Sequence, residues 1–116
     1  MDRQDCIFCK IARGDMPASI VYQDAEVVVF KDIHPSAPIH YLIIPRIHLD
    51  SAAEAEEQHA PLLGKLIVTA AKIAHAEGFA TFDYRLVTNI GRDGGQSVFH
   101  LHWHLMAGRR MTWPSG

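Results

Sequence analysis

Residues 100–106 read His-Leu-His-Trp-His-Leu-Met, and this alternation of imidazole and apolar side chains decides the fold. Successive side chains of a β-strand point to opposite faces of a sheet. A strand over His100–Ala107 therefore presents three histidines on one face and apolar side chains on the other. The pattern predicts one face that carries chemistry and one that belongs to the core. Two alternatives stay open at this point: imidazoles that are only hydrogen-bonded, or an adventitious metal-binding row.

A loop rich in glycine precedes the histidines. This loop covers residues 91–97, of which residues 93–97 read Asp-Gly-Gly-Gln-Ser. Glycine lets backbone N–H groups converge on an anion, and Ser97 adds a hydroxyl donor. The loop thus indicates a phosphate site, although Asp-Gly and Gly-Gly are also common in ordinary hairpin connections.

The rest of the chain predicts four more strands and two helices. Residues 57–77 carry an apolar stripe at helical spacing, which includes Leu66 and Ile67 and ends before Gly78. This helix should pack across the sheet. The other predicted elements are a short helix over Cys6–Arg13 and strands over Ile20–Tyr22, Glu26–Lys31, His40–Ile44 and Tyr84–Asn89. Their order indicates an α+β fold with an antiparallel sheet of about five strands, one long helix and a short N-terminal helix.

The overall composition limits the classes of protein to which the chain can belong. Its 116 residues fit one domain over residues 1–116, and 48% apolar with 21% charged residues is typical of a globular protein. A net charge of −2 argues against broad nucleic-acid binding. A membrane span needs a run of roughly 18 apolar residues, and the sequence has none. The first residues also lack the apolar stretch of a signal peptide, so we expect a cytoplasmic protein.

The two cysteines, Cys6 and Cys9, form a Cys-x-x-Cys pair. In a reducing compartment this spacing favours half of a metal site over a disulfide framework. A thioredoxin-like redox role is disfavoured because no βαβ pattern surrounds the pair. The remaining alternative is a pair of reduced thiols without a metal.

Residues 93–106 resemble the signature of the histidine triad (HIT) superfamily, His-φ-His-φ-His-φ-φ with φ apolar, in its Hint branch. Further segments resemble this branch in order and spacing, so the resemblance covers nearly the whole chain. These segments are residues 6–11, 30–33, 37–45, 87–89 and 108–114.

The resemblance implies that His102 attacks the α-phosphorus of a purine nucleotide and forms a transient nucleotidyl-histidine. For this role His102 must be neutral with one ring nitrogen free, so its other nitrogen should donate to a backbone carbonyl. The resemblance also implies a set of groups around the phosphoryl oxygens: His104, Ser97, Asn89, His40 and the loop residues Gly95 and Gln96. For His40 a satisfied core histidine is an equal alternative.

The resemblance further implies where the nucleoside binds. Asp32 would accept hydrogen bonds from the ribose hydroxyls, although a turn or cap role is its alternative. An apolar slot for the base would be formed by Ile7, Phe8, Ile11, Phe30 and Ile33, each of which is also a plausible core residue. Members of this branch are homodimers, which predicts an interface on the long helix and the final strand. Trp113 would then reach toward the partner's site, unless it is a surface residue of a frayed tail.

Some bacterial members carry a structural zinc ion, and the resemblance implies that its ligands here are Cys6, Cys9, His48 and His100. Two thiolates and two imidazoles suit tetrahedral zinc and leave no open coordination position. We therefore expect the ion to support the fold and to take no part in the chemistry.

Three functions compete at this point. The resemblance favours hydrolysis of purine nucleoside 5′-phosphoramidates, in which a P–N bond is cleaved. The first alternative is hydrolysis of dinucleoside polyphosphates. The second is a zinc-stabilised nucleotide-binding or adaptor protein whose catalysis is incidental.

Overall fold

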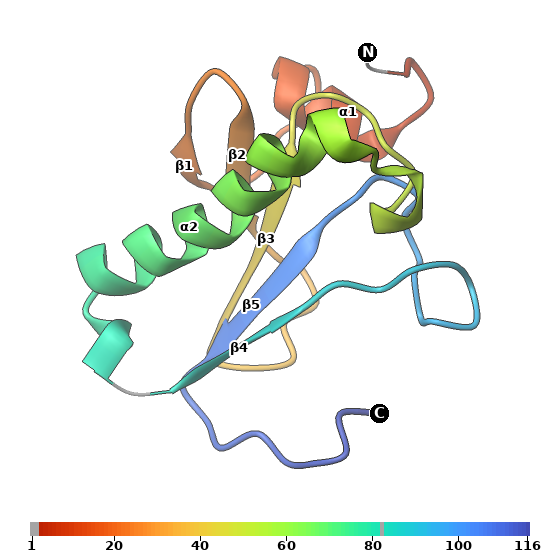
Figure 1. The fold of residues 1–116 in the computed structure, drawn as a ribbon. Coiled ribbons are helices and arrows are strands. Elements are labelled where there is room, and N and C mark those ends of the chain that lie inside the picture. The colour runs from red at the N-terminus through yellow and green to blue at the C-terminus, as the bar shows by residue number, and fades with distance from the viewer. Residues whose placement is uncertain (1–2, 82) are drawn as a thin grey trace.

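The computed structural model describes residues 3–81 and 83–116, and its centre is a five-stranded antiparallel sheet (Figure 1). The strands lie in the order β1-β2-β3-β5-β4. The α+β class predicted from the sequence is therefore confirmed. The α-helices and strands are α1 (Ile7–Arg13), β1 (Ile20–Gln23), β2 (Val27–Lys31), β3 (Ile39–Pro45), α2 (Ala60–Ala76), β4 (Tyr84–Val87) and β5 (Trp103–Ala107). Three short 3-10 helices cover Ala52–Glu54, Glu57–His59 and Phe79–Thr81.

The histidine strand β5 lies inside the sheet, between β3 and β4. It begins at Trp103, so the prediction of a strand from His100 was wrong in its start. The β-ladder stops at Trp103 because the backbone groups of residues 101 and 102 hydrogen-bond to partners outside the sheet. The Leu101 N–H donates to the Leu49 carbonyl at 2.7 Å, and the Thr88 hydroxyl donates to the His102 carbonyl at 2.7 Å. The nucleophile candidate is thus held by side-chain and loop contacts.

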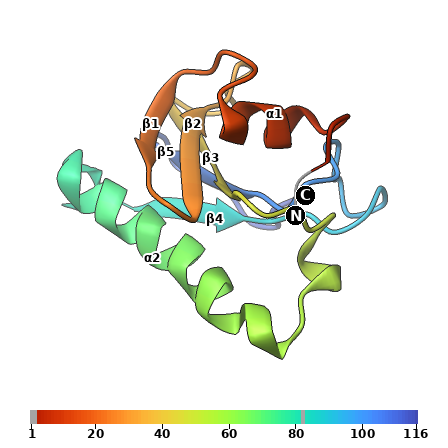
Figure 2. The same cartoon turned by 90° about the horizontal axis from the view of Figure 1, so that it is seen from above.

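Each face of the sheet has its own core, and the two helices cover opposite faces (Figure 2). The larger core joins α2 to the sheet and contains Leu101 and Leu105. The smaller core joins α1 to the sheet and contains Phe8 and Phe30. His102 contacts Phe8 from this second side, so the predicted alternation of faces holds although the strand is shorter.

Helix α2 differs from the predicted apolar stripe at one position. Ile67 is 46% exposed, whereas Thr69 is buried and donates its hydroxyl to the Lys65 carbonyl at 2.7 Å. Of the residues that the structure describes, no helix is both long enough and apolar enough to cross a membrane.

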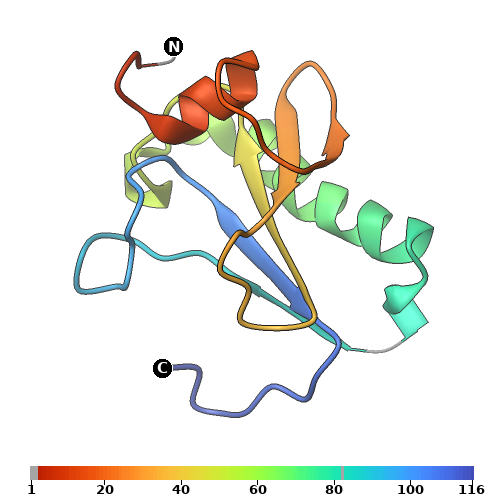
Figure 3. The ribbon, with the colours of Figure 1, turned by 180° about the vertical axis from the view of Figure 1, so that it is seen from behind.

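One end of the sheet gathers several segments that are far apart in the sequence. Seen from behind, α1 and the segment between β4 and β5 lie near the point where β3 ends (Figure 3). Contacts between Cys9 and His48, and between His100 and Pro45, join these segments. The side chains of Cys6, Cys9, His48 and His100 come together at this end.

Candidate active site

The ring of His102 is buried and is oriented by its own backbone neighbourhood. Its Nδ1 lies 2.7 Å from the carbonyl oxygen of His100. A carbonyl oxygen only accepts, so Nδ1 carries the ring hydrogen and Nε2 keeps a free lone pair. Burial lowers the pKa of His102, which favours the neutral ring. These are the tautomer and charge that the sequence predicts for an attacking imidazole.

A hydrogen-bonded series of groups fixes the tautomers of the neighbouring histidines. The Ser36 N–H donates to His40 Nδ1 at 2.9 Å, so a neutral His40 carries its hydrogen on Nε2. His40 Nε2 lies 2.9 Å from His104 Nδ1, which therefore accepts. His104 is left with its hydrogen on Nε2. Burial, with His102 and His40 nearby, lowers the pKa of His104 to about 4, so the ring is a neutral donor at pH 7.

Asp32 joins this histidine pair. Its Oδ2 lies 3.4 Å from His40 Nε2, and its Oδ1 accepts the His34 N–H at 2.8 Å. The second contact is the turn role that the sequence left open for Asp32. The first contact places a carboxylate oxygen beside the histidines, and the ribose-binding role of Asp32 stays a prediction.

The glycine-rich loop is held by its own side chains. A Cβ on Gly94 would lie 2.3 Å from the Ile90 carbonyl oxygen, so only glycine fits there. The amide of Asn89 donates to the Gly94 carbonyl at 2.7 Å. Gln96 is buried and accepts the Gly91 N–H at 2.9 Å. The side chains of Asn89 and Gln96 thus brace the loop, while Ser97 is exposed.

The structure brings part of the predicted apolar slot together. Phe8 and Phe30 are buried and meet edge to face, with their ring centroids 5.3 Å apart. Ile11 packs against the same core. Ile33 is 86% exposed and lies outside this cluster, and Ile7 is also exposed. Trp113 lies at the surface with 85% of its area exposed.

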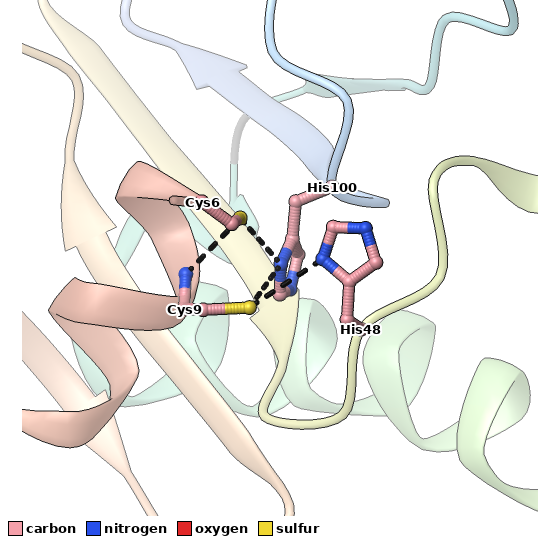
Figure 4. Close-up of side chains that lie close together, drawn as sticks. All are labelled: Cys6, Cys9, His48 and His100. Carbon is pink, nitrogen blue, oxygen red and sulfur yellow. Dashed lines mark hydrogen bonds between the residues drawn. The ribbon is translucent and has the colours of Figure 1, made fainter. Parts of the chain in front are cut away.

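The side chains of Cys6, Cys9, His48 and His100 converge on one point between α1, the segment after β3 and the segment before β5 (Figure 4). Their ligand atoms all lie within 4.8 Å of one another. The separations from Cys6 Sγ to His100 Nδ1, Cys9 Sγ to His48 Nδ1 and Cys9 Sγ to His100 Nδ1 are 3.3, 3.4 and 3.5 Å. Tetrahedral zinc bonds to sulfur and nitrogen give about 3.6 Å for this separation.

The outer nitrogens of both imidazoles are also occupied in the manner of metal ligands. His48 Nε2 donates to Asp50 Oδ1 at 2.6 Å, and His100 Nε2 donates to the Pro45 carbonyl at 2.8 Å. Such partners leave the lone pair on Nδ1, which faces the sulfur atoms. The four residues therefore fit a zinc ion. Sequence reasoning missed Asp50 and Pro45, and the only available signal was a carboxylate two residues after His48.

Histidines clustered at a central strand, beside a glycine-rich loop, define the class of histidine-triad proteins. Comparisons with known proteins agree. Residues 5–113 match the family described as scavenger mRNA decapping enzyme C-term binding. In solved structures, the chain is similar to a HIT family hydrolase from Legionella pneumophila, with a TM-score of 0.94 and 46% identity over 97% of this chain and 100% of that one. The chain belongs to the HIT family.

Curated relatives carry more specific names. HitA of Neisseria gonorrhoeae is 52% identical over 88% of this chain and 94% of its own length. The purine nucleoside phosphoramidase of Escherichia coli K12 is 48% identical over 91% of this chain and 89% of that protein. A 14 kDa zinc-binding protein of Zea mays is 45% identical over 100% of this chain and 91% of its own. The resemblance stated from the sequence is confirmed.

Proposed function

We propose that this chain hydrolyses purine nucleoside 5′-phosphoramidates through a transient nucleotidyl-histidine at His102. One observation carries the proposal: the Nδ1 hydrogen of His102 is fixed on the His100 carbonyl, which leaves Nε2 free to attack. The purine nucleoside phosphoramidase of E. coli, 48% identical to this chain, supports the choice of substrate.

The chemistry proceeds in two displacements. The Nε2 lone pair of His102 forms a bond to the α-phosphorus, and the P–N bond breaks with its electron pair going to the amine, which takes a proton from solvent as it leaves. Water then attacks the same phosphorus and gives up a proton to solvent, the P–Nε2 bond breaks with its electron pair returning to His102, and the nucleoside monophosphate is released. Each step avoids direct attack of water on the stable P–N bond.

Donors around the phosphorus would stabilise the charge on the phosphoryl oxygens. His104 offers its Nε2 hydrogen, because His40 occupies its Nδ1. The backbone N–H groups of the loop and the Ser97 hydroxyl would add further hydrogen bonds. Asp32 would accept from the ribose hydroxyls, and the ring pair of Phe8 and Phe30 would support the base.

The proposal is tested by comparing adenosine 5′-phosphoramidate with diadenosine tetraphosphate as substrates for the wild-type chain and for His102→Ala. We expect much faster turnover of the phosphoramidate, and loss of most of that rate in the variant while AMP still binds. Faster cleavage of the tetraphosphate would favour the dinucleoside polyphosphate alternative. Cleavage of neither substrate would favour the nucleotide-binding or adaptor alternative.

We also propose that a structural zinc ion occupies the cluster of Cys6, Cys9, His48 and His100. The sulfur and nitrogen donors, their spacing and the partners of both imidazoles support it, as does the name of the maize relative. Four protein ligands would close the coordination shell. Thiols in a metal site call for a reducing compartment, which supports the cytoplasm as the location.

A homodimer is the proposed assembly. Ile67 and Val68 of α2 are about half exposed. The final strand, β5, was predicted to share the interface, but it lies inside the sheet, so the edge strand β4 takes its place in this proposal. Light scattering on the wild-type chain should give twice the monomer mass. Val68→Glu should give the monomer, and an unchanged dimer would exclude this face.

A further inference from the structure

A path of hydrogen bonds joins the Cys/His cluster to the glycine-rich loop. His48 Nε2 donates to Asp50 Oδ1 at 2.6 Å. The carbonyl oxygen of Asp50 accepts from Gln96 Nε2 at 2.6 Å. Gln96 Oε1 in turn accepts the Gly91 N–H at 2.9 Å. Three hydrogen bonds thus connect a ligand of the cluster to the first glycine of the loop.

The side-chain amide of Gln96 lies at the centre of this path, and both its oxygen and its nitrogen make hydrogen bonds. Gln96 is only 5% exposed. Besides the Asp50 carbonyl, its Nε2 donates to the Val98 carbonyl at 3.0 Å. One side chain therefore ties both ends of the loop, at Gly91 and Val98, to the segment that carries His48. A buried amide with all its partners in place is rigid, and each lost partner is costly.

The sequence predicted Gln96 as a nucleotide-binding residue, but its side-chain amide is already occupied by backbone groups of the protein. Its hydrogen bonds run to the backbone of the loop and of Asp50. Its contribution to binding is therefore indirect, through the position of the loop backbone. This makes Gln96 a positioning residue.

We propose that Gln96 couples metal binding to the order of residues 91–98, so that the metal ion and the nucleotide phosphate bind cooperatively. A metal held at His48 Nδ1 fixes the imidazole, and the fixed Nε2 holds Asp50 in place for Gln96. Without the metal, His48 Nδ1 keeps only its weaker contact with Cys9 Sγ at 3.4 Å, so the anchor of the loop is less firmly held. The phosphate half of this inference rests on the proposed phosphoramidate hydrolysis, whereas the effect of the metal on the loop rests only on the proposed zinc site.

The first test is amide hydrogen exchange, measured by NMR without nucleotide on zinc-loaded and zinc-stripped protein. Couplings of this kind change equilibria by about 5- to 150-fold, so we expect exchange at Gly91 and its loop neighbours to rise by at least about fivefold on zinc removal. Gln96→Met, which keeps the size but has no amide, should exchange fast in both states. Glu54→Gln is the control, because Glu54 also contacts Asp50, at its N–H, but lies off the path.

Three results of this test would overturn the proposal. One is a loop whose exchange is unaffected by zinc in the wild-type protein. Another is a zinc response that persists in Gln96→Met. The third is loss of protection in α2 together with the loop, because the metal would then support the whole fold and not this segment.

The second test uses reciprocity between the two ligands. Zinc affinity, measured by competition with a chromogenic chelator, should rise at least about fivefold when AMP is bound to the wild-type protein, and should not change in Gln96→Met. AMP that binds without any effect on zinc affinity would overturn the cooperative binding. If AMP does not bind at all, the proposed function fails, and the exchange test alone decides whether zinc orders the loop.

Discussion

His102 Nδ1 donates to the carbonyl oxygen of His100, two residues earlier, across 2.7 Å. The same residue, His100, directs its own ring toward Cys6 and Cys9. Its backbone therefore orients the nucleophile while its side chain belongs to the metal cluster. The proposed function assigns the free Nε2 of His102 to the attack on phosphorus, and the following predictions test the groups around it.

His40 should act through His104. Replacement by phenylalanine removes the partner of His104 Nδ1, and an unpartnered buried polar group costs about 1–3 kcal/mol. We expect His40→Phe to lower kcat on adenosine 5′-phosphoramidate by about 5- to 150-fold, with a smaller change in KM. His34→Gln, an exposed neighbour, is the control. A folded His40→Phe with unchanged kcat would identify His40 as a satisfied core histidine only.

The low pKa of His104 predicts a loss of stability in acid. Its pKa is about 4 in the folded chain, whereas an unfolded histidine titrates near about 6.5. Between these values the unfolded chain binds the proton and the folded chain does not, so the free energy of unfolding falls as pH drops through this window. The slope from one group is at most about 1.4 kcal/mol per pH unit.

Urea denaturation of the wild-type chain and His104→Gln checks this at pH 7, 6 and 5. Glutamine can still accept from His40, and both proteins would lose zinc in acid alike, so the difference between them isolates His104. We expect the variant to lose less stability on acidification. Parallel curves would mean that His104 does not titrate in this window.

Gly94 should not tolerate a side chain. A Cβ would meet the Ile90 carbonyl oxygen at 2.3 Å, and overpacking of this kind costs about 1–3 kcal/mol. Because the loop must shift, Gly94→Ala should weaken AMP binding, measured by calorimetry. The loss of binding free energy should exceed the loss in the free energy of unfolding. Arg92→Ala, in the same exposed loop, should bind AMP within about twofold of wild type. Equal affinity in both variants would contradict a role for the loop backbone in binding.

Zinc should stabilise the folded chain through Cys9. Free zinc at about 100 times its dissociation constant adds about 2.7 kcal/mol to the free energy of unfolding. We expect one zinc ion per wild-type chain by elemental analysis, and a lower melting temperature after chelation. Cys9→Ala should hold much less zinc, and a chelator should not change its melting temperature. A chelator effect of equal size in both proteins would place the ion elsewhere.

The alternation of residues 100–106 carried most of the fold prediction, because a period of two determines which side chains share a face. It could not fix the start of β5. That boundary depends on Leu49 and Thr88, whose contacts with residues 101 and 102 exist only in the folded chain. Ile67 was predicted as buried for a similar reason, since helical spacing indicates a stripe but not its edge.

The candidate site was predictable in its residue types and less so in their roles. The proposed metal ligands come from three segments that share no local pattern, and only the family resemblance joined them before the structure did. Gln96 shows the limit most clearly. A glutamine in a glycine-rich loop reads as a ligand contact, and only the positions of Asp50 and Gly91 reveal that it braces the loop.

The most direct test of the account is to trap the intermediate. Rapid mixing of the protein with adenosine 5′-phosphoramidate, acid-free quenching and peptide mass spectrometry should find an adenylyl group on the peptide that contains His102, with fragment ions placing it on that residue. The adduct should appear within one turnover and be missing in His102→Ala. Turnover without any adduct, or an adduct on His104, would contradict the assignment of His102 as the nucleophile.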